Sequence, residues 1–295
     1  MKYYVISDIH AYYDNLMDVI EKTDFDPSNP THKFVCLGNL LDRGNQPKEC
    51  LAYITTLLAT DSVILVQGNY DLSVSEALKR GYFTDGDRSN GTVDTAKLIT
   101  GMEDEQVAMT MLRSNINFRN YMNALLPYYE TKNNIFISGW IPCYKIPYMT
   151  KSGEFFIKEP DWRNAPEKEW FECAWYNGMK VWSYGIREAD KTIICGSVPT
   201  SWGHYNLHRE GGRLEDIPEG EKVDFSSPNA PICTPFVDDG IICIEGGTAH
   251  GMQMNCILVE DDPLDEFNPT KMIAIDTKAP APKQNYPKKF FTSFV

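Results

Sequence analysis

The stretch KFVCLGNLLDRG, residues 33–44, sets the pattern from which the fold can be predicted. Its first half is an apolar run typical of a buried strand, and its second half is a polar loop that begins with glycine. Two more apolar runs, KYYVIS (2–7) and SVILVQ (62–67), have the same character. The segments between the runs, YYDNLMDVIEKT (12–23) and QPKECLAYITTLLA (46–59), read as helices. This alternation of strand and helix predicts a mainly parallel sheet.

A polar loop follows each of these three strands, namely SDIH (7–10), GNLLDRG (38–44) and GNYD (68–71). The carboxyl ends of parallel strands meet at one edge of a sheet, and functional loops gather there. All three loops carry side chains that can bind metal ions. We therefore expect a functional site at this edge.

The middle of the chain, residues 72–126, reads as helical, with interruptions at Gly81 and at DGDRSNG (85–91). It resembles an inserted cap that would cover the loops. The aromatic-rich segment EWFECAWYNGMKVWSYGI (169–186) predicts a further helix and its packing surface. Its large side chains could line a ligand groove, and core packing is the interpretation we favour.

Short strands return after the cap and predict a second sheet packed on the first: NNIFIS (133–138), TIICG (192–196), GIICIEGG (240–247) and MQMNCILVED (252–261). The predicted fold class is therefore α/β (α+β), a two-sheet β-sandwich flanked by helices with a helical cap insertion. We expect one domain over residues 1–260 and a C-terminal extension over 261–295.

The amino-acid composition indicates which partners and which cellular compartment to expect. With 28 basic and 41 acidic residues the net charge is −13, and no run of Lys and Arg is present. Such a chain should repel nucleic acid and anionic membranes, so neither is expected as a partner. The eight scattered cysteines suit buried free thiols of a reducing compartment. No long apolar segment predicts a leader or a membrane span, so we expect a cytoplasmic protein.

Six segments in order carry a more specific resemblance: SDIHAYYDNL, GNLLDRG, GNYD, SGW, CGSVPTSW and IEGGTAHG. From residue 3 to about residue 260 the chain resembles the calcineurin-like metallophosphoesterases, above all the bacterial and phage branch of the serine/threonine phosphoprotein phosphatases. The resemblance implies two β-sheets flanked by helices and two divalent metal ions at the strand ends. In the family these ions share a bridging aspartate and a hydroxide, polarise the phosphoryl group and supply the nucleophile.

Five positions match the motifs of the family. The resemblance implies that Asp8 and His10 are ligands of the first metal and that Asn69 is a ligand of the second. It makes Arg43 a phosphate-binding residue, and it makes Asp42 the residue that orients the proton donor. Alternatively, Arg43 pairs with Asp8 or Asp42 and holds the loops together.

Six other positions depart from the family pattern. Two histidine ligands of the second metal are replaced by serine, the proton-donating histidine by tyrosine, the bridging aspartate by asparagine, an aspartate near the end by glutamate, and a glycine by alanine. The residues at these positions are Ser138 and Ser197, Tyr70, Asn39, Glu245 and Ala11.

These departures predict a centre that cannot hold two metals. A neutral amide at Asn39 bridges cations poorly, and serine is a weak ligand compared with imidazole. Tyrosine titrates near pKa ~10, so Tyr70 would be a poor proton shuttle at neutral pH. We expect at most one weakly bound Mn²⁺ or Mg²⁺ at Asp8 and His10, completed by water or by the Asn39 oxygen, or no metal.

Relocated ligands could rescue the centre, and the candidates are His204, His250 and Glu245. His204 and His208 would share one face of a helix, but the residues around them argue against a stable helix there. The favoured hypothesis is a pseudophosphatase that keeps the fold and binds a phosphorylated ligand, a nucleotide or a protein partner. The alternative hypothesis is a weak or altered one-metal phosphoesterase.

Overall fold

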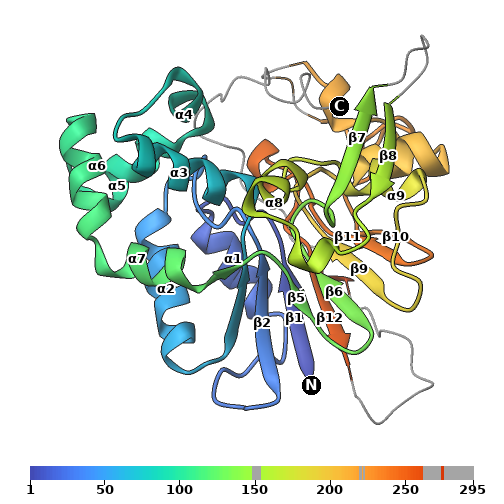
Figure 1. The fold of residues 1–295 in the computed structure, drawn as a ribbon, viewed down its shortest axis with the longest axis horizontal. Helices are drawn as coiled ribbons and strands as arrows, with labels where there is room; N and C mark the ends of the chain where they lie inside the picture. Colours follow the sequence, from blue (N-terminus) through green and yellow to red (C-terminus); the bar gives the residue numbers. More distant parts are fainter. Residues whose placement is uncertain (148–153, 219–220, 222, 262–273, 276–295) are drawn as a thin grey trace.

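The computed structural model describes residues 1–147, 154–218, 221, 223–261 and 274–275. Most of the predicted C-terminal extension, 261–295, therefore lies outside the described residues. Two main sheets and a separate hairpin make up the β-structure (Figure 1).

The first sheet has six strands in the order β13-β12-β1-β2-β3-β4. Strands β1 to β4 run parallel to one another, and β12 lies antiparallel to β1. Their bounds are β1 Lys2–Ile6, β2 His32–Leu37, β3 Val63–Val66, β4 Leu125–Leu126, β12 Cys256–Glu260 and β13 Ala274–Ile275. The parallel arrangement follows from the apolar runs and the helices between them, as predicted.

The second sheet has five strands in the order β10-β11-β9-β6-β5. Strands β6, β9 and β11 are parallel, and the edge strands β5 and β10 are antiparallel to their neighbours. Their bounds are β5 Tyr129–Glu130, β6 Asn134–Phe136, β9 Thr192–Cys195, β10 Phe236–Asp238 and β11 Ile241–Cys243. The hairpin of β7 Cys143–Pro147 and β8 Glu154–Lys158 stands apart from both sheets.

The helices fall into two groups on either side of the sheets (Figure 1). The first group is α1 Tyr13–Ile20, α2 Pro47–Ala59, α3 Asn69–Arg80, α4 Asp85–Asn90, α5 Thr92–Thr100, α6 Glu105–Ser114 and α7 Ile116–Ala124. The second group is α8 Glu167–Cys173, α9 Gly178–Ser183, α10 Ser201–Gly203 and the π-helical turn η2 His204–His208. Short 3₁₀ turns lie at η1 Trp162–Asn164, η3 Leu214–Asp216 and η4 Thr248–His250.

Alternation along the strands explains why the two sheets pack as a sandwich. In β1, Tyr3 and Val5 face a core shared with Phe136 and Ile194 of the second sheet. The intervening Tyr4 and Ile6 face the helices of the first group. Successive residues of a strand point to opposite faces, so one strand contributes to both cores. The predicted fold class, a two-sheet sandwich flanked by helices, is confirmed.

Two local predictions about the insertion were wrong. DGDRSN was expected to interrupt the helices, but it forms α4. The backbone N–H of Asp87 donates to Thr84 Oγ1, the carboxylate of Asp87 accepts from the Thr84 backbone, and Gly91 ends the helix with φ +89°. The helical run also ends at Ala124, because Leu125 and Leu126 pair with β3. None of residues 72–126 lines the pocket described below.

The structure also corrects two predictions in the second half of the chain. The aromatic-rich segment forms two short helices, α8 and α9, instead of one. Residues 204–208 are helical after all, because the ring of His204 is buried and packs edge-on against Phe236, 5.7 Å between centroids. This tertiary contact outweighs the weak local propensity.

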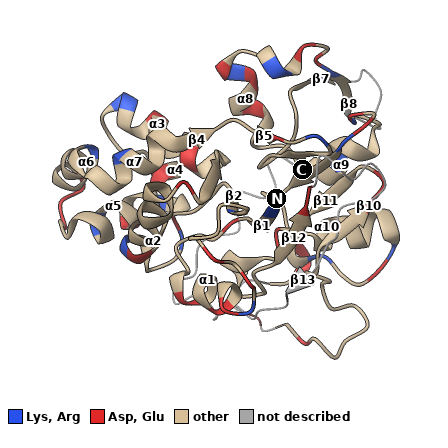
Figure 2. Ribbon diagram, turned by 90° about the horizontal axis from the view of Figure 1, so that it is seen from below, with Lys and Arg blue, Asp and Glu red and all other residues tan. Residues whose placement is uncertain are grey.

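The structure shows how the charged residues are distributed and in which state the cysteines are. Lys and Arg are dispersed among acidic residues along elements such as α3 and α8 (Figure 2). All eight cysteines are buried and free. Among the described residues, no helix is long and apolar enough to cross a bilayer.

Candidate functional site

The loops after β1, β2, β3, β9 and β11 meet beside the sheets and line one pocket. It encloses about 730 Å³ of space, part of it open to solvent. Eight of its lining residues were singled out from the sequence: Asp8, His10, Arg43, Asn69, Tyr70, Ser197, Glu245 and His250. The parallel strands thus bring most of the predicted site together.

Asn39 lies beneath the pocket and joins its loops. The backbone N–H of Tyr70 donates to the side-chain oxygen of Asn39 at 3.0 Å. Since a backbone N–H can only donate, that atom of the amide must be the oxygen. The amide nitrogen therefore faces the other way, and it donates to Asp8 Oδ1 and to Asn69 Oδ1, both at 2.8 Å. Asn39 places N–H groups between two predicted metal ligands.

Asp71 fixes the backbone around Asn39. Its Oδ2 accepts from the backbone N–H groups of Asn39, at 3.0 Å, and of Gly68, at 2.8 Å. Its Oδ1 accepts from the hydroxyl of Tyr121 in α7 at 2.7 Å. Burial raises the pKa of Asp71 to about 6 in spite of these hydrogen bonds. Its role is to hold the loops after β2 and β3 in register.

Asp8 and His10 lie side by side with His10 in a defined tautomer. His10 Nδ1 faces the carbonyl oxygen of Leu41 at 3.3 Å and therefore carries the hydrogen, because the carbonyl can only accept. Its Nε2 lone pair lies 3.7 Å from Asp8 Oδ1. Burial, helped by the nearby Arg43, lowers the pKa of His10 well below its usual value. Burial raises the pKa of Asp8, whose Oδ2 accepts from the Ser197 backbone at 2.8 Å.

Arg43 and Tyr70 contact each other at the pocket wall. The guanidinium of Arg43 donates to the Tyr70 hydroxyl, and its carbon lies 4.7 Å from the centre of the Tyr70 ring. This contact joins the loop after β2 to the start of α3, so Arg43 does link the loops, although through Tyr70. Burial raises the pKa of Tyr70, which keeps its hydroxyl protonated.

Asp42 is directed toward α5. Its Oδ2 accepts from the Thr92 hydroxyl at 2.6 Å, and its backbone N–H donates to the Thr95 hydroxyl at 3.1 Å. Burial raises the pKa of Asp42 to about 7. These contacts anchor the loop to the insertion.

The two serines at the predicted ligand positions are separated. Ser197 lines the pocket, but its hydroxyl donates to the carbonyl of Ala174 at 3.3 Å. Ser138 instead lines a second, smaller cavity beside Trp140 and Trp170. The structure therefore does not bring both hydroxyls to one point in the pocket.

Of the proposed rescue residues, Glu245 and His250 line the pocket and His204 does not. Glu245 Oε1 accepts from the Gly247 backbone at 2.8 Å, while Oε2 is buried without a partner among the described residues. Burial, reinforced by the nearby Asp8 carboxylate, raises the pKa of Glu245 above its ordinary value.

The loops are held in a costly backbone conformation. Left-handed backbone is unfavourable for residues with a side chain by roughly 1–2 kcal/mol each. Seven such residues cluster here, with φ between 52° and 68°: Asp8, His10, Ala11, Asn39, Asp42, Arg43 and Ser197. The φ of +57° at Ala11 gives a physical reason for a glycine at that position in related chains.

This donor set does not fit the two bridged cations that the resemblance implies. The amide N–H groups of Asn39 face Asp8 and Asn69, where a bridging aspartate would offer an oxygen. The serine hydroxyls add no second cluster of ligands. For a single cation, Asp8 Oδ1 and His10 Nε2 are two acceptor atoms that fit.

Some pocket residues were missed by the sequence analysis. Asn177 caps α9 through its Oδ1, and Glu215 enters from η3. Trp175 was interpreted as packing, yet its ring also lines the pocket, 6.2 Å from that of Tyr70. An asparagine between two aromatic helical segments was the one available signal for Asn177.

Comparison with known proteins agrees with the motifs. A symmetrical bis(5'-nucleosyl)-tetraphosphatase of Klebsiella pneumoniae is 42% identical over 72 residues, 24% of this chain and 24% of that protein. The one of Xanthomonas campestris pv. campestris is 32% identical over 113 residues, 38% of this chain and 32% of that protein. The chain thus matches about a quarter to a third of the length of these relatives.

Solved structures that align with this chain include a serine/threonine phosphatase of Saccharomyces cerevisiae, with TM-score 0.49 and 14% identity over 98% of this chain and 82% of that one. A metallophosphoesterase of Sphaerobacter thermophilus gives TM-score 0.44 and 15% identity over 89% and 84%. A family model described as calcineurin-like phosphoesterase matches residues 1–224. The chain belongs to the calcineurin-like phosphoesterase family.

Proposed function

We propose that this member of the family binds a nucleotide-type phosphate ester in the pocket and has lost the two-metal hydrolysis of its relatives. The observation that carries the proposal is the hydrogen bonding of Asn39. Its amide nitrogen donates to Asp8 Oδ1 and Asn69 Oδ1, so the position between these two predicted ligands holds N–H groups where a metal pair would need a bridging oxygen. The positively polarised N–H groups also repel a cation at that position, and each leaves its acceptor oxygen one lone pair fewer for a metal.

Three groups at the pocket wall support a phosphate ester as the ligand. Arg43 supplies a permanent positive charge suited to phosphate oxygens. Asn177 is 5% exposed, and its Nδ2 has no partner among the described residues, so it can donate to a ligand oxygen. The ring of Trp175 offers a surface on which a base can stack. The nucleotide substrate class in the names of the similar enzymes favours this ligand over a phosphopeptide.

Calorimetry on the metal-stripped chain tests the metal part of the proposal. Titration with Mn²⁺ should give at most one weak site, and formation of ADP from diadenosine tetraphosphate, followed by nucleotide chromatography, should stay at background. Two tight Mn²⁺ sites, or turnover at rates ordinary for phosphatases, would overturn it.

A second titration tests the ligand. ATP added in the presence of EDTA should bind, and Arg43→Gln should weaken the binding about tenfold, which corresponds to about 1.4 kcal/mol. Arg119→Gln, at an exposed position in α7, is the matched control and should bind as the wild type does. If a phosphopeptide binds and ATP does not, the nucleotide assignment is wrong.

The one-metal phosphoesterase remains a second candidate because Asp8 Oδ1 and the His10 Nε2 lone pair lie 3.7 Å apart. It predicts Mn²⁺-dependent hydrolysis of p-nitrophenyl phosphate that disappears in Asp8→Asn. Hydrolysis that persists in this variant would rule the candidate out.

A further inference from the structure

A second group of ligand-type side chains lies outside the pocket, at the turn that follows α10. His204, His208 and Glu210 each offer one atom, and these atoms lie within 4.8 Å of one another. None of the three lines the pocket. We propose that they form a separate binding site for one metal ion of the zinc class.

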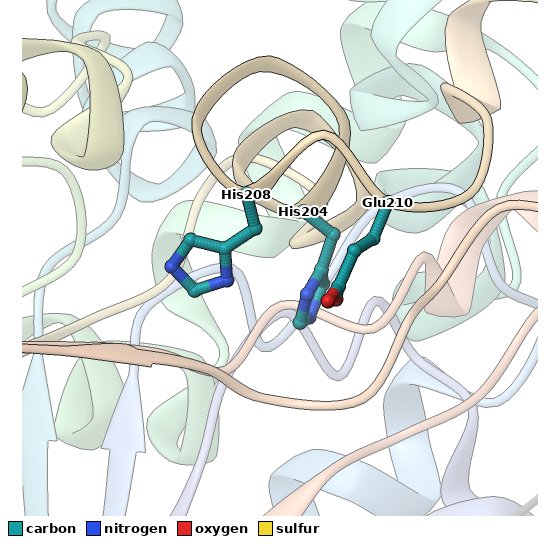
Figure 3. Close-up of side chains that lie close together, drawn as sticks. All are labelled: His204, His208 and Glu210. Carbon is teal, nitrogen blue, oxygen red and sulfur yellow. The ribbon is translucent and has the colours of Figure 1, made fainter.

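The backbone brings the three side chains to one side of the turn. His204 and His208 lie four residues apart in the π-helical turn η2, so they project from a common face. Arg209 ends the turn with φ +65°, and the backbone N–H of Glu210 then donates to the carbonyl of His204 at 2.9 Å. Figure 3 shows the three side chains on one side of the turn, with the Glu210 carboxylate beside the His204 ring and the His208 ring turned to the left of them.

His204 presents a buried lone pair. Its Nε2 lies 3.1 Å from the carbonyl oxygen of Thr234, so Nε2 carries the hydrogen. Its Nδ1 must then be an acceptor, and this atom is buried without a hydrogen-bond partner among the described residues. The residue as a whole is 8% exposed. A buried acceptor without a donor is costly, and a metal ion would satisfy it.

His208, like His204, directs its Nε2 toward an oxygen acceptor of the protein. Its Nε2 lies 3.1 Å from Asp238 Oδ2 in β10, so the hydrogen on Nε2 points to a carboxylate and leaves Nδ1 as the acceptor. The rings of His204 and His208 lie 5.9 Å apart at 74°. Metal-binding histidines ordinarily donate their second N–H to a carboxylate or a carbonyl, and both patterns occur here.

The donor set indicates the class of metal. Two imidazole nitrogens and one carboxylate suit Zn²⁺, which prefers four ligands, whereas Mg²⁺ prefers oxygen alone. His208 and Glu210 are exposed, so a metal ion can enter and water can complete the coordination. A bound ion would tie η2 to Glu210 and, through Asp238, to the edge of the second sheet.

A Zn²⁺ titration of the metal-stripped full chain tests the site. The series is run in Asp8→Asn, which removes a pocket ligand, so that any binding at the pocket is suppressed. One equivalent of Zn²⁺ should bind and raise the Tm. Co²⁺ should give the visible absorption of a low-symmetry site.

Two variants at exposed positions locate the binding. Glu210→Gln keeps the shape of the side chain, and His208→Gln keeps a hydrogen-bonding group. Each variant should weaken Zn²⁺ binding at least tenfold and abolish the rise in Tm. Glu221→Gln, another exposed carboxylate, is the matched control and should bind normally. The proposal is overturned if the parent chain binds no Zn²⁺, if Glu210→Gln and His208→Gln bind it unchanged, or if binding is lost with Asp8→Asn alone.

Discussion

In the pocket, Asn39 donates its amide hydrogens to Asp8 and Asn69, whereas at the turn after α10 the buried Nδ1 of His204 accepts nothing from the described residues. Both regions contain residue types that bind metals. In the pocket, Asp8 Oδ1 and Asn69 Oδ1 each already accept one hydrogen of the protein, from the same amide. At the turn, the partners Thr234 and Asp238 orient the two imidazoles and leave one lone pair on each.

The difference teaches that residue type alone does not predict a metal site. What decides is which lone pairs remain after the internal hydrogen bonds have formed, because a buried donor and a cation compete for the same acceptor. The two proposals together predict that this chain binds metal weakly at the family position and more tightly at the turn after α10.

The largest expected effect comes from Asn39→Asp, which reverses the donor pattern in the pocket. The new oxygen would face Asp8 Oδ1 and Asn69 Oδ1, and buried acceptors without donors are costly. We expect the metal-free variant to lose about 3 kcal/mol of unfolding free energy by urea denaturation. Mn²⁺ should recover much of this loss, because the new carboxylate can bind it.

Asn45→Asp is the matched control for that experiment. It makes the same chemical change at an exposed position of the same loop, six residues away. We expect its stability to stay within about 0.5 kcal/mol of the wild type and not to respond to Mn²⁺. A metal-free Asn39→Asp that is as stable as Asn45→Asp would show that the Asn39 hydrogen bonds contribute nothing to the fold.

A smaller effect is expected from Gly68→Ala, which tests how closely the loops approach. A Cβ at this position would lie 2.2 Å from the side-chain oxygen of Asn39 and 2.7 Å from its backbone nitrogen. The substitution should therefore lower the unfolding free energy by about 2 kcal/mol. Thermal denaturation in a calorimeter measures it.

Gly101→Ala separates crowding from backbone strain. Gly101 has φ +75°, and a Cβ there would meet nothing within 4 Å, so only the left-handed backbone is penalised. The expected loss is about 1 kcal/mol. Gly68 itself has φ −102°, so its substitution carries no such backbone penalty, and no loss in Gly68→Ala would mean that the contact between Gly68 and Asn39 relaxes without cost.

Much of the fold could be predicted from the sequence because its determinants are local. The runs at β1, β2 and β3 are apolar, and each ends at a polar loop. This pattern was enough to predict the parallel sheet and the edge at which the pocket-lining loops meet. The hairpin β7–β8 was missed, because Tyr144 and Ile157 are 44% exposed and the strand pattern does not alternate between apolar and polar residues. Helix α4 was missed because its turn-forming residues are stabilised by a capping box with Thr84.

The site was predictable only in part for a different physical reason. The strand ends brought Asp8, His10 and Asn69 together, as parallel pairing requires. The sequence also identified Asn39 as a departure, but the direction of its amide depends on the backbone N–H of Tyr70, 31 residues away. The convergence of Asn177 and Glu215 on the pocket depends likewise on packing between segments that are distant in the chain.

The smallest expected effect on stability comes from the carboxylate of Glu130 in β5, which is partly exposed and has partners within the protein. Its carboxylate accepts two hydrogen bonds from Arg163, at 2.6 and 2.8 Å, and lies 3.0 Å from Lys191 Nζ. The hydrogen bonds from Arg163 are the main cause that lowers the pKa of Glu130 to about 2. Because the folded-state pKa lies below the unfolded one, this stabilisation is complete above about pH 4.5 and is lost as the pH falls toward 2.

Glu130→Gln should therefore cost about 1 kcal/mol at pH 7, since the carboxylate is 22% exposed and partly screened by water. The difference from the wild type should shrink between pH 4.5 and 2 and vanish below that range. Urea denaturation at pH 7, 4 and 2 measures it. A loss of unfolding free energy that stays constant over this pH range would mean that Glu130 acts through packing. A loss at pH 7 as large as that of Asn39→Asp would remove the distinction between buried and surface polar groups.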